Sequence, residues 1–172
     1  MPPQEPFVTR RLQVERDIVA DEYGFLKANA HARAKYSIPA PSWHRIFWHP
    51  DYSTGAYPTS DDFIRDVARL TREHIVDRLV ELGCDYIQLD APNYAQWHID
   101  PGNRAAFEEH GHDMAHELVA RVEEATRYVP LDRLAVSPQC GFASGEIART
   151  MTLAEQEAKL RLIGDIARRV WR

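Results

Sequence analysis

With 172 residues, the chain has the length of one ordinary domain. Apolar residues make up 44% and charged residues 27% of it, a composition that excludes disordered, collagen-like and disulfide-scaffold proteins. Because 21 basic residues face 26 acidic ones, the net charge is −5 with neutral histidines, and we expect neither nucleic acid nor an anionic membrane as a partner.

Location is also constrained by the sequence. No apolar run approaches the roughly 20 residues of a membrane span, and the start Met1–Glu5 lacks the basic and apolar parts of a signal peptide. Two cysteines, Cys84 and Cys140, cannot build a disulfide framework. These observations predict a soluble cytoplasmic protein.

Helices and strands are predicted to alternate along the chain. In chain order, we expect a helix at Asp21–Ala30, a strand at Ala34–Ile38, a helix at Asp61–Leu82, a strand at Asp85–Asp90, a helix at Arg104–Arg127, a strand at Arg133–Ser137 and a helix from Leu153 to the C-terminus. Gly83 is expected to end the second helix, and Thr152 with Glu155 forms a capping box before the last. This alternation predicts an α/β fold with a parallel sheet.

Polar, aromatic and proline residues gather where each predicted strand ends. The three segments are Ile38–Trp43, Asp90–Tyr94 and Ser137–Phe142. Ligands of parallel α/β folds bind beyond the carboxyl ends of the strands, so a site is expected there.

Asp90 and Cys140 are the most reactive groups in these segments. The carboxylate of Asp90 could hold a substrate ammonium group or act as a base, or it could cap a helix or loop. The thiolate of Cys140 could bind zinc or attack an electrophile, or it could be a small buried residue. Cys84, which precedes a strand directly after Gly83, fits the buried alternative.

Histidines offer a second possible metal site. His112 and His116 are four residues apart and would share one helix face, with His110 and Asp113 close by. The stretch lacks the glutamate of the metalloprotease motif, which favours a solvated helix face. Three further histidines lie in the predicted loops of the site, namely His44, His49 and His98.

Three parts of the chain resemble a known enzyme family. They are Asp21–Lys27 with Tyr36–Ser42, then Tyr86–Pro92, which reads Tyr-Ile-Gln-Leu-Asp-Ala-Pro, and Leu134–Phe142, which contains Ser-Pro-Gln-Cys-Gly. The last two are similar to the Ile-Gln-Ile-Asp-Glu-Pro strand and the Ser-Pro-Asp-Cys-Gly strand of the catalytic domain of cobalamin-independent methionine synthase. The likeness is greatest to the short methionine synthase II branch.

The resemblance implies a fold and an activity. The fold would be a (β/α)8 TIM barrel, and the enzyme a zinc-dependent S-methyltransferase of methionine biosynthesis that moves a methyl group from a methylated folate to homocysteine thiolate. Cys140 would be a zinc ligand, Asp90 would hold the substrate amino group, and the loop with Ser42 and Trp43 would contribute to substrate binding.

The chain departs from the family in two ways. A complete barrel takes about 250 residues, so we expect an incomplete (β/α)8 TIM-barrel-like domain over residues 1–172. One long helix replaces two strands and their helices, which indicates an internal deletion near residues 118–121. The His-x-Cys strand that supplies further zinc ligands in the family is also missing, so the ligand set is incomplete.

Three hypotheses for the function follow. The first is methyl transfer to a homocysteine-like thiol, and the second is an inactive remnant that acts as a folded or oligomeric binding protein. The third is an unrelated metal hydrolase that uses the histidines near Asp113. An incomplete barrel leaves strand edges open, so we also expect a homo-oligomer.

Overall fold

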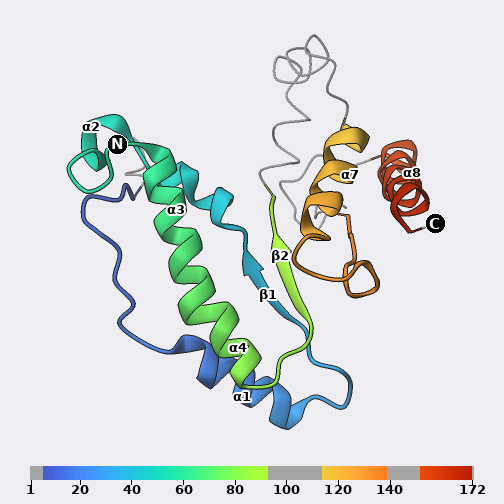
Figure 1. Ribbon diagram of the computed structural model, residues 1–172, viewed down its shortest axis with the longest axis horizontal. Helices are drawn as coiled ribbons and strands as arrows, with labels where there is room; N and C mark the ends of the chain where they lie inside the picture. The colour runs from blue at the N-terminus through green and yellow to red at the C-terminus, as the bar shows by residue number, and fades with distance from the viewer. Residues whose placement is uncertain (1–5, 93–113, 139–151, 172) are drawn as a thin grey trace. The chain divides into compact units, whose positions relative to one another are not determined.

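The computed structural model describes residues 6–92, 114–138 and 152–171 (Figure 1). The chain divides into two compact units, Met1–Ala91 and Pro92–Arg172.

The first unit alternates helices with two short strands. In chain order its elements are α1 (Ile18–Asn29), β1 (Tyr36–Pro39), the 3-10 helix η1 (Pro41–Phe47), α2 (Pro50–Ser53), α3 (Ser60–Thr71), the π-helical turn η2 (Arg72–Val76), α4 (Asp77–Glu81) and β2 (Ile87–Asp90).

The succession α3, η2 and α4 is the predicted second helix of the chain. It begins with a capping box, in which the Thr59 hydroxyl accepts the Asp62 N–H and the Asp62 carboxylate accepts the Thr59 N–H. It ends before Gly83, whose φ of +80° suits glycine. The prediction is therefore confirmed, and the π-helical turn within it was not foreseen.

Strands β1 and β2 pair in parallel, as predicted for Ala34–Ile38 and Asp85–Asp90. Their register places Tyr36 beside Ile87 and Pro39 beside Asp90. The side chains of the first pair, Tyr36 and Ile87, pack against a core cluster from α1, α4 and the segment that precedes β2. The cluster consists of Val19, Tyr23, Leu79 and Cys84. Cys84 is thus the small buried residue that its position predicted.

A second core cluster forms at the start of α3 and includes the N-terminal arm, residues 6–17. The buried members of the cluster are Ala56, Tyr57, Phe63 and Val67, and Val8 of the arm packs against them. Two hydrogen bonds hold the arm at this cluster, one from Val8 N–H to the Phe47 carbonyl (2.8 Å) and one from Leu12 N–H to the Tyr57 hydroxyl (2.9 Å).

The second unit contains α7 (Met114–Ala125), the 3-10 turn η3 (Leu131–Arg133) and α8 (Leu153–Val170). Helix α8 starts with the predicted capping box of Thr152 and Glu155. Its side chain Ile166 is fully buried, and the Trp171 indole beyond it donates to the Leu131 carbonyl at 2.9 Å. The predicted start of α7, near Arg104, lies outside the described residues.

The prediction of an incomplete (β/α)8 TIM-barrel-like fold is wrong. Two parallel strands form the whole sheet of the described part, which is otherwise mainly helical. The predicted third strand, Arg133–Ser137, starts within the turn η3 and pairs with no described strand. A strand is stable only when a neighbour satisfies its backbone groups. Side chains of Leu134–Ser137 alternate between half-buried and exposed, so the apolar run reflects one-sided burial outside a sheet.

Within residues 6–92, 114–138 and 152–171, no helix is both long enough and apolar enough to cross a lipid bilayer.

Candidate functional site

The candidate site lies where the two parallel strands end. The last pair in their register is Pro39 with Asp90, and the next N–H, that of Ala40, donates to the Asp90 carbonyl at 2.7 Å. The backbone of Asp90 is thereby fixed against the loop that leaves β1. Ligand-binding residues are expected at such an edge because the loops that follow parallel strands begin there.

Polar side chains share one face of this sheet. Tyr36 and Ile87 contact the core of α1 and α4, so strand alternation places Ser37, Gln88 and Asp90 on the opposite face. Gln88 accepts a hydrogen bond from the Lys35 ammonium at 2.7 Å, while Asp90 is half-buried. The face away from the helices therefore carries an amide and a carboxylate two residues apart.

The loop after β1 brings Ser42 and Trp43 to the same edge. Both belong to η1, which starts with a hydrogen bond from Trp43 N–H to the Ala40 carbonyl (2.9 Å), and both are half-buried. The structure thus gathers three of the four predicted site residues, Asp90, Ser42 and Trp43, around the ends of paired strands. Their roles in binding stay predictions.

Arg45 anchors this loop, a function that the sequence analysis missed. Its guanidinium donates to the Ser60 hydroxyl (2.6 Å) and to the Asp61 carboxylate (2.7 Å), both in the first turn of α3. The signal available in the sequence was an arginine in a loop that precedes an acidic helix start. Because the loop is tied at both ends, its residues are presented on a firm support.

Two loop histidines have different surroundings. His49 caps α2 by accepting the Asp51 N–H on Nδ1 at 3.2 Å, which is a structural role. The Nδ1 atom of His44, also in η1, is buried and has no hydrogen-bond partner within the described ranges. His44 is therefore the loop histidine whose ring nitrogen is not used by the fold.

The predicted metal ligands fall largely outside the described part of the chain. Cys140 lies there, as do His98, His110, His112 and Asp113, while His116 is within α7. Among the residues that the structure describes, no three His, Cys, Asp or Glu side chains are grouped to hold a metal ion. The zinc site thus stays a prediction for Cys140 and its unassigned partners.

In chemical terms, the described edge can bind a cation. A carboxylate such as that of Asp90 accepts strong charge-assisted hydrogen bonds from an ammonium group. Half-burial of Asp90 would limit competition from water.

Comparisons with known proteins give partial likenesses. The uncharacterized proteins YxjG and YxjH of Bacillus subtilis (strain 168) are each 56% identical to this chain over 56 residues. The matched stretch covers 33% of this chain but only 15% of either relative. No family model matches the chain, and no solved structure matches it.

Proposed function

We propose that the chain contributes the amino-acid binding part of a methyltransferase that methylates the thiol of homocysteine with a methylated folate as donor. The observation that carries this proposal is the pairing of Pro39 with Asp90, with the Ala40 N–H on the Asp90 carbonyl. It brings together Tyr36–Ser42 and Tyr86–Pro92, two of the segments that carry the resemblance to cobalamin-independent methionine synthase. The proposal includes the cytoplasm as the place of reaction.

Asp90 would bind the substrate ammonium group. Its main chain is fixed by the bond from Ala40, so only its side chain has to be ordered when the substrate arrives. Ser42 and Trp43 would contact the remainder of the substrate, since η1 begins at the same edge. These residues bind and orient the substrate, and none of them is assigned a bond-making step.

The resemblance also implies zinc, which would supply a thiolate of lowered pKa when bound. Cys140 is the residue that would ligate it by that resemblance. The described residues do not form a zinc site, so we assign no step to the metal. Measured zinc content of the purified protein, compared between the wild type and Cys140→Ser, tests this ligand separately from substrate binding.

Homocysteine binding to the full chain tests the proposal most directly. Isothermal titration should show saturable binding that weakens at least about tenfold in Asp90→Asn, because a charged acceptor is lost. The matched control is Asp85→Asn, because Asp85 lies just before β2 and its carboxylate pairs with the exposed Arg33. Equal binding by the wild type and Asp90→Asn would overturn the proposal.

The products of the reaction separate this function from its two alternatives. With zinc in excess, methionine should form from homocysteine and a methylated folate, and Cys140→Ser should abolish its formation. Binding of homocysteine without methionine formation would instead indicate a binding protein. Metal that is lost in His112→Ala but kept in Cys140→Ser would indicate the histidine-based metal hydrolase.

A further inference from the structure

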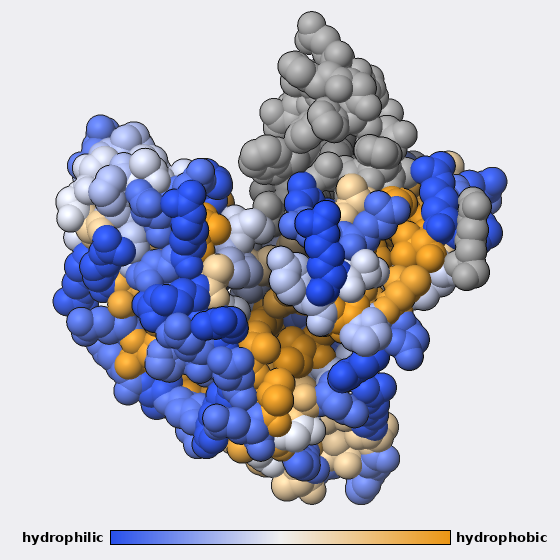
Figure 2. All heavy atoms as spheres, viewed as in Figure 1, coloured by the Kyte–Doolittle hydropathy of each residue, from blue (hydrophilic) through white to orange (hydrophobic). Residues whose placement is uncertain are grey.

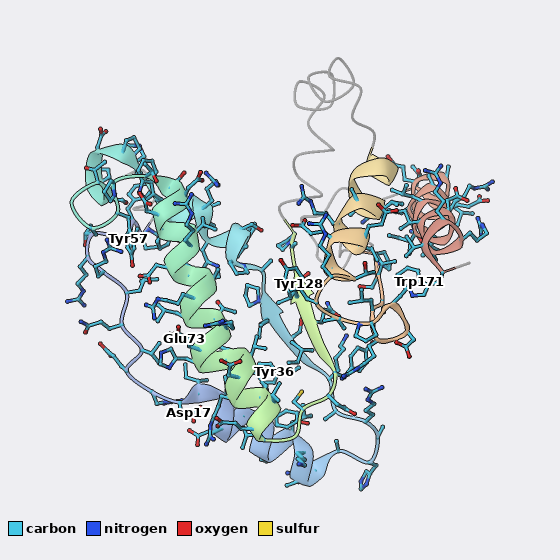
Figure 3. The ribbon with its side chains drawn as sticks, in the orientation of Figure 1. Asp17, Tyr36, Tyr57, Glu73, Tyr128 and Trp171 are labelled. Atoms are coloured by element: carbon cyan, nitrogen blue, oxygen red, sulfur yellow. The ribbon has the colours of Figure 1, made fainter. Side chains whose placement is uncertain are left out.

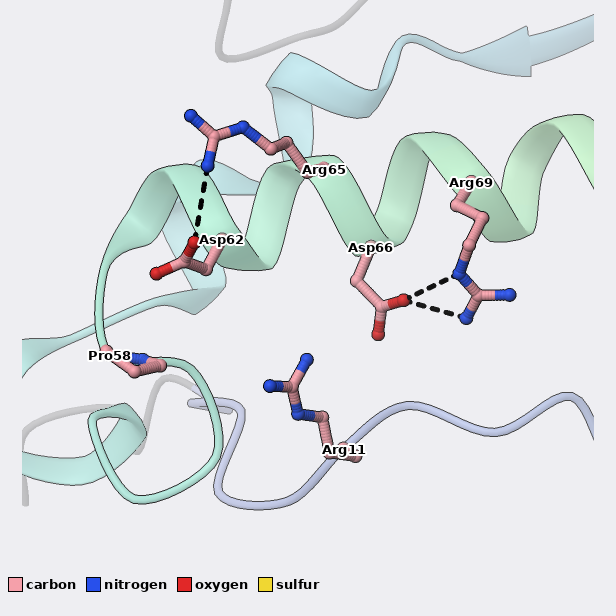
Figure 4. A pocket seen from close by; sticks show the side chains of 6 residues that line it. All are labelled: Arg11, Pro58, Asp62, Arg65, Asp66 and Arg69. Carbon is pink, nitrogen blue, oxygen red and sulfur yellow. Dashed lines mark hydrogen bonds and ion pairs between the residues drawn. The ribbon is translucent and has the colours of Figure 1, made fainter.

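A hollow of about 410 Å³ lies between the N-terminal arm and the first turns of α3 (Figure 4). Its lining consists of Arg11, Pro58, Asp62, Arg65, Asp66 and Arg69. Three guanidinium groups therefore face two carboxylates, which leaves one excess positive charge. Figure 2 shows that hydrophilic side chains cover this side of α3.

Both carboxylates of the hollow already have partners. Asp62 belongs to the capping box with Thr59 and also pairs with Arg65 at 3.3 Å. The hydroxyl of Thr59 and the ion pair hold the pKa of Asp62 below its usual range.

Asp66 likewise has both a hydrogen-bond partner and an ion-pair partner. It accepts the Tyr57 hydroxyl at 2.6 Å and pairs with Arg69 at 2.7 Å, and these bonds keep its pKa low. Arg69 is in turn shared with Glu73 at 2.7 Å. Among the residues that line the hollow, Asp62 and Asp66 thus offset Arg65 and Arg69, and the remaining positive charge is that of Arg11.

Arg11 differs from the other two arginines. Its guanidinium carbon lies 4.5 Å from the centre of the Tyr57 ring, and it forms no ion pair with any residue in the described ranges. The ring below it is fixed, because Tyr57 is fully buried and its hydroxyl is held by Asp66 and by the Leu12 N–H. The guanidinium is therefore oriented by stacking while its N–H donors remain available to the hollow.

We propose that this hollow binds an oxyanion, a carboxylate or phosphate group of a small ligand, with Arg11 as the principal donor and Arg65 as the second. A planar guanidinium offers parallel N–H donors that match two oxygens of such a group. Stacking on Tyr57 removes much of the entropy that an exposed arginine otherwise loses on binding. The site is separate from the strand edge of Asp90 and does not depend on methyl transfer.

The competing explanation is that Arg11 only offsets the charge of Asp62 and Asp66 at long range. Any cation at this position would then serve, and no anion would be bound. The chain provides a matched control in Arg33, which is likewise exposed and lies over a tyrosine ring, that of Tyr86, at 5.2 Å. Unlike Arg11, it is paired with a carboxylate, Asp85 at 3.1 Å.

Titration of the full chain with inorganic phosphate and, separately, with acetate at low ionic strength tests the proposal by NMR or calorimetry. Saturable binding of at least one of them is expected, and which one binds identifies the class of oxyanion. Arg11→Gln should weaken that binding about ten- to hundredfold, and Arg33→Gln should leave it unchanged. Arg11→Lys, which keeps the charge but not the fork, should weaken it to an intermediate degree.

Three results would overturn the proposal. They are the absence of saturable binding of either anion, equal binding by the wild type and Arg11→Gln, and an equal loss in Arg11→Gln and Arg33→Gln, which would show an effect of net charge alone. Should Arg11→Gln fail to fold, Arg11→Lys decides in its place, since binding as tight as that of the wild type would show that the guanidinium is not required.

Discussion

Removal of one hydroxyl group should measure how firmly the N-terminal arm is attached to α3. Tyr57, labelled in Figure 3, is fully buried. Its hydroxyl donates to the Asp66 carboxylate at 2.6 Å and accepts the Leu12 N–H at 2.9 Å. Tyr57→Phe keeps the ring and deletes both bonds. Because one of them ends on a charged and largely buried carboxylate, 13% exposed, the expected loss in the free energy of unfolding is about 1.5–3 kcal/mol.

The loss should depend on pH in a defined direction. The Tyr57 hydroxyl is the main cause that lowers the pKa of Asp66 in the folded state. A lowered folded pKa stabilises the protein above the unfolded value, near pH 3.8, and this contribution is lost as the pH falls through the folded value. The difference between the wild type and Tyr57→Phe should therefore be complete at pH 7 and narrow below about pH 4.

Urea unfolding followed by circular dichroism measures both effects. Tyr52→Phe is the control, because Tyr52 belongs to the same unit and is 57% exposed, so its free energy of unfolding should change by less than about 0.5 kcal/mol. A loss in Tyr57→Phe no larger than that of the control, or a loss that does not shrink in acid, would refute the reasoning.

Two further predictions concern the core of α1, α4 and the sheet. Leu79→Ala should lower the free energy of unfolding, measured in urea, by about 2–5 kcal/mol because Leu79 is fully buried. The control is Val80→Ala, because Val80 is 61% exposed and its loss should be less than about 0.5 kcal/mol. Similar losses in the two variants would contradict the packing. Burial and the hydrogen bond to Glu22 raise the pKa of Tyr36 to about 12. A raised folded pKa stabilises the protein below the unfolded value of 10.0, so stability should fall between about pH 10 and 12. Burial also raises the pKa of Tyr23 and Tyr57, so absorbance titration should show one fewer late-ionising tyrosine in Tyr36→Phe than in the wild type.

The helices could be predicted because their signals are local. The capping box of Thr152 and Glu155 and the stop at Gly83 each depend on residues within one turn of the helix end, and the structure confirms both. The π-helical turn Arg72–Val76 has no comparable local signal. It depends on how the whole helix of α3, η2 and α4 packs, and the apolar periodicity carries no information about that packing.

The strands show where prediction from local pattern ends. Short apolar runs occur at Ile87–Asp90 and at Leu134–Ser137, yet only the first of them pairs with another described strand. Pairing is decided by a distant segment with free backbone groups, and a four-residue run does not specify that partner. The alternation predicts a parallel sheet and the family resemblance implies a barrel, but the third run adds no strand to the sheet of the described part.

The part of the candidate site that could be predicted is the part that depends on the predicted pairing of β1 and β2. Asp90 and the loop with Ser42 and Trp43 came together because β1 and β2 do pair in parallel. Cys140 depends on the third run and lies outside the described residues, so its part in the site stays a prediction. Arg11 could not be found from the sequence, since its stacking on Tyr57 joins residues 46 positions apart that share no motif.

The segment between β1 and α3 connects the two proposed sites mechanically. It is tied to the Asp90 carbonyl at Ala40, to the first turn of α3 at Arg45, and to the Tyr57 carbonyl by the Trp48 indole at 3.0 Å. These bonds are made by the Ala40 N–H, the Arg45 guanidinium and the Trp48 indole. Ligand binding is assigned to two other groups, the Asp90 carboxylate and the Arg11 guanidinium. Side-chain substitution at either site therefore leaves the shared support in place, and failure of one proposal carries no consequence for the other.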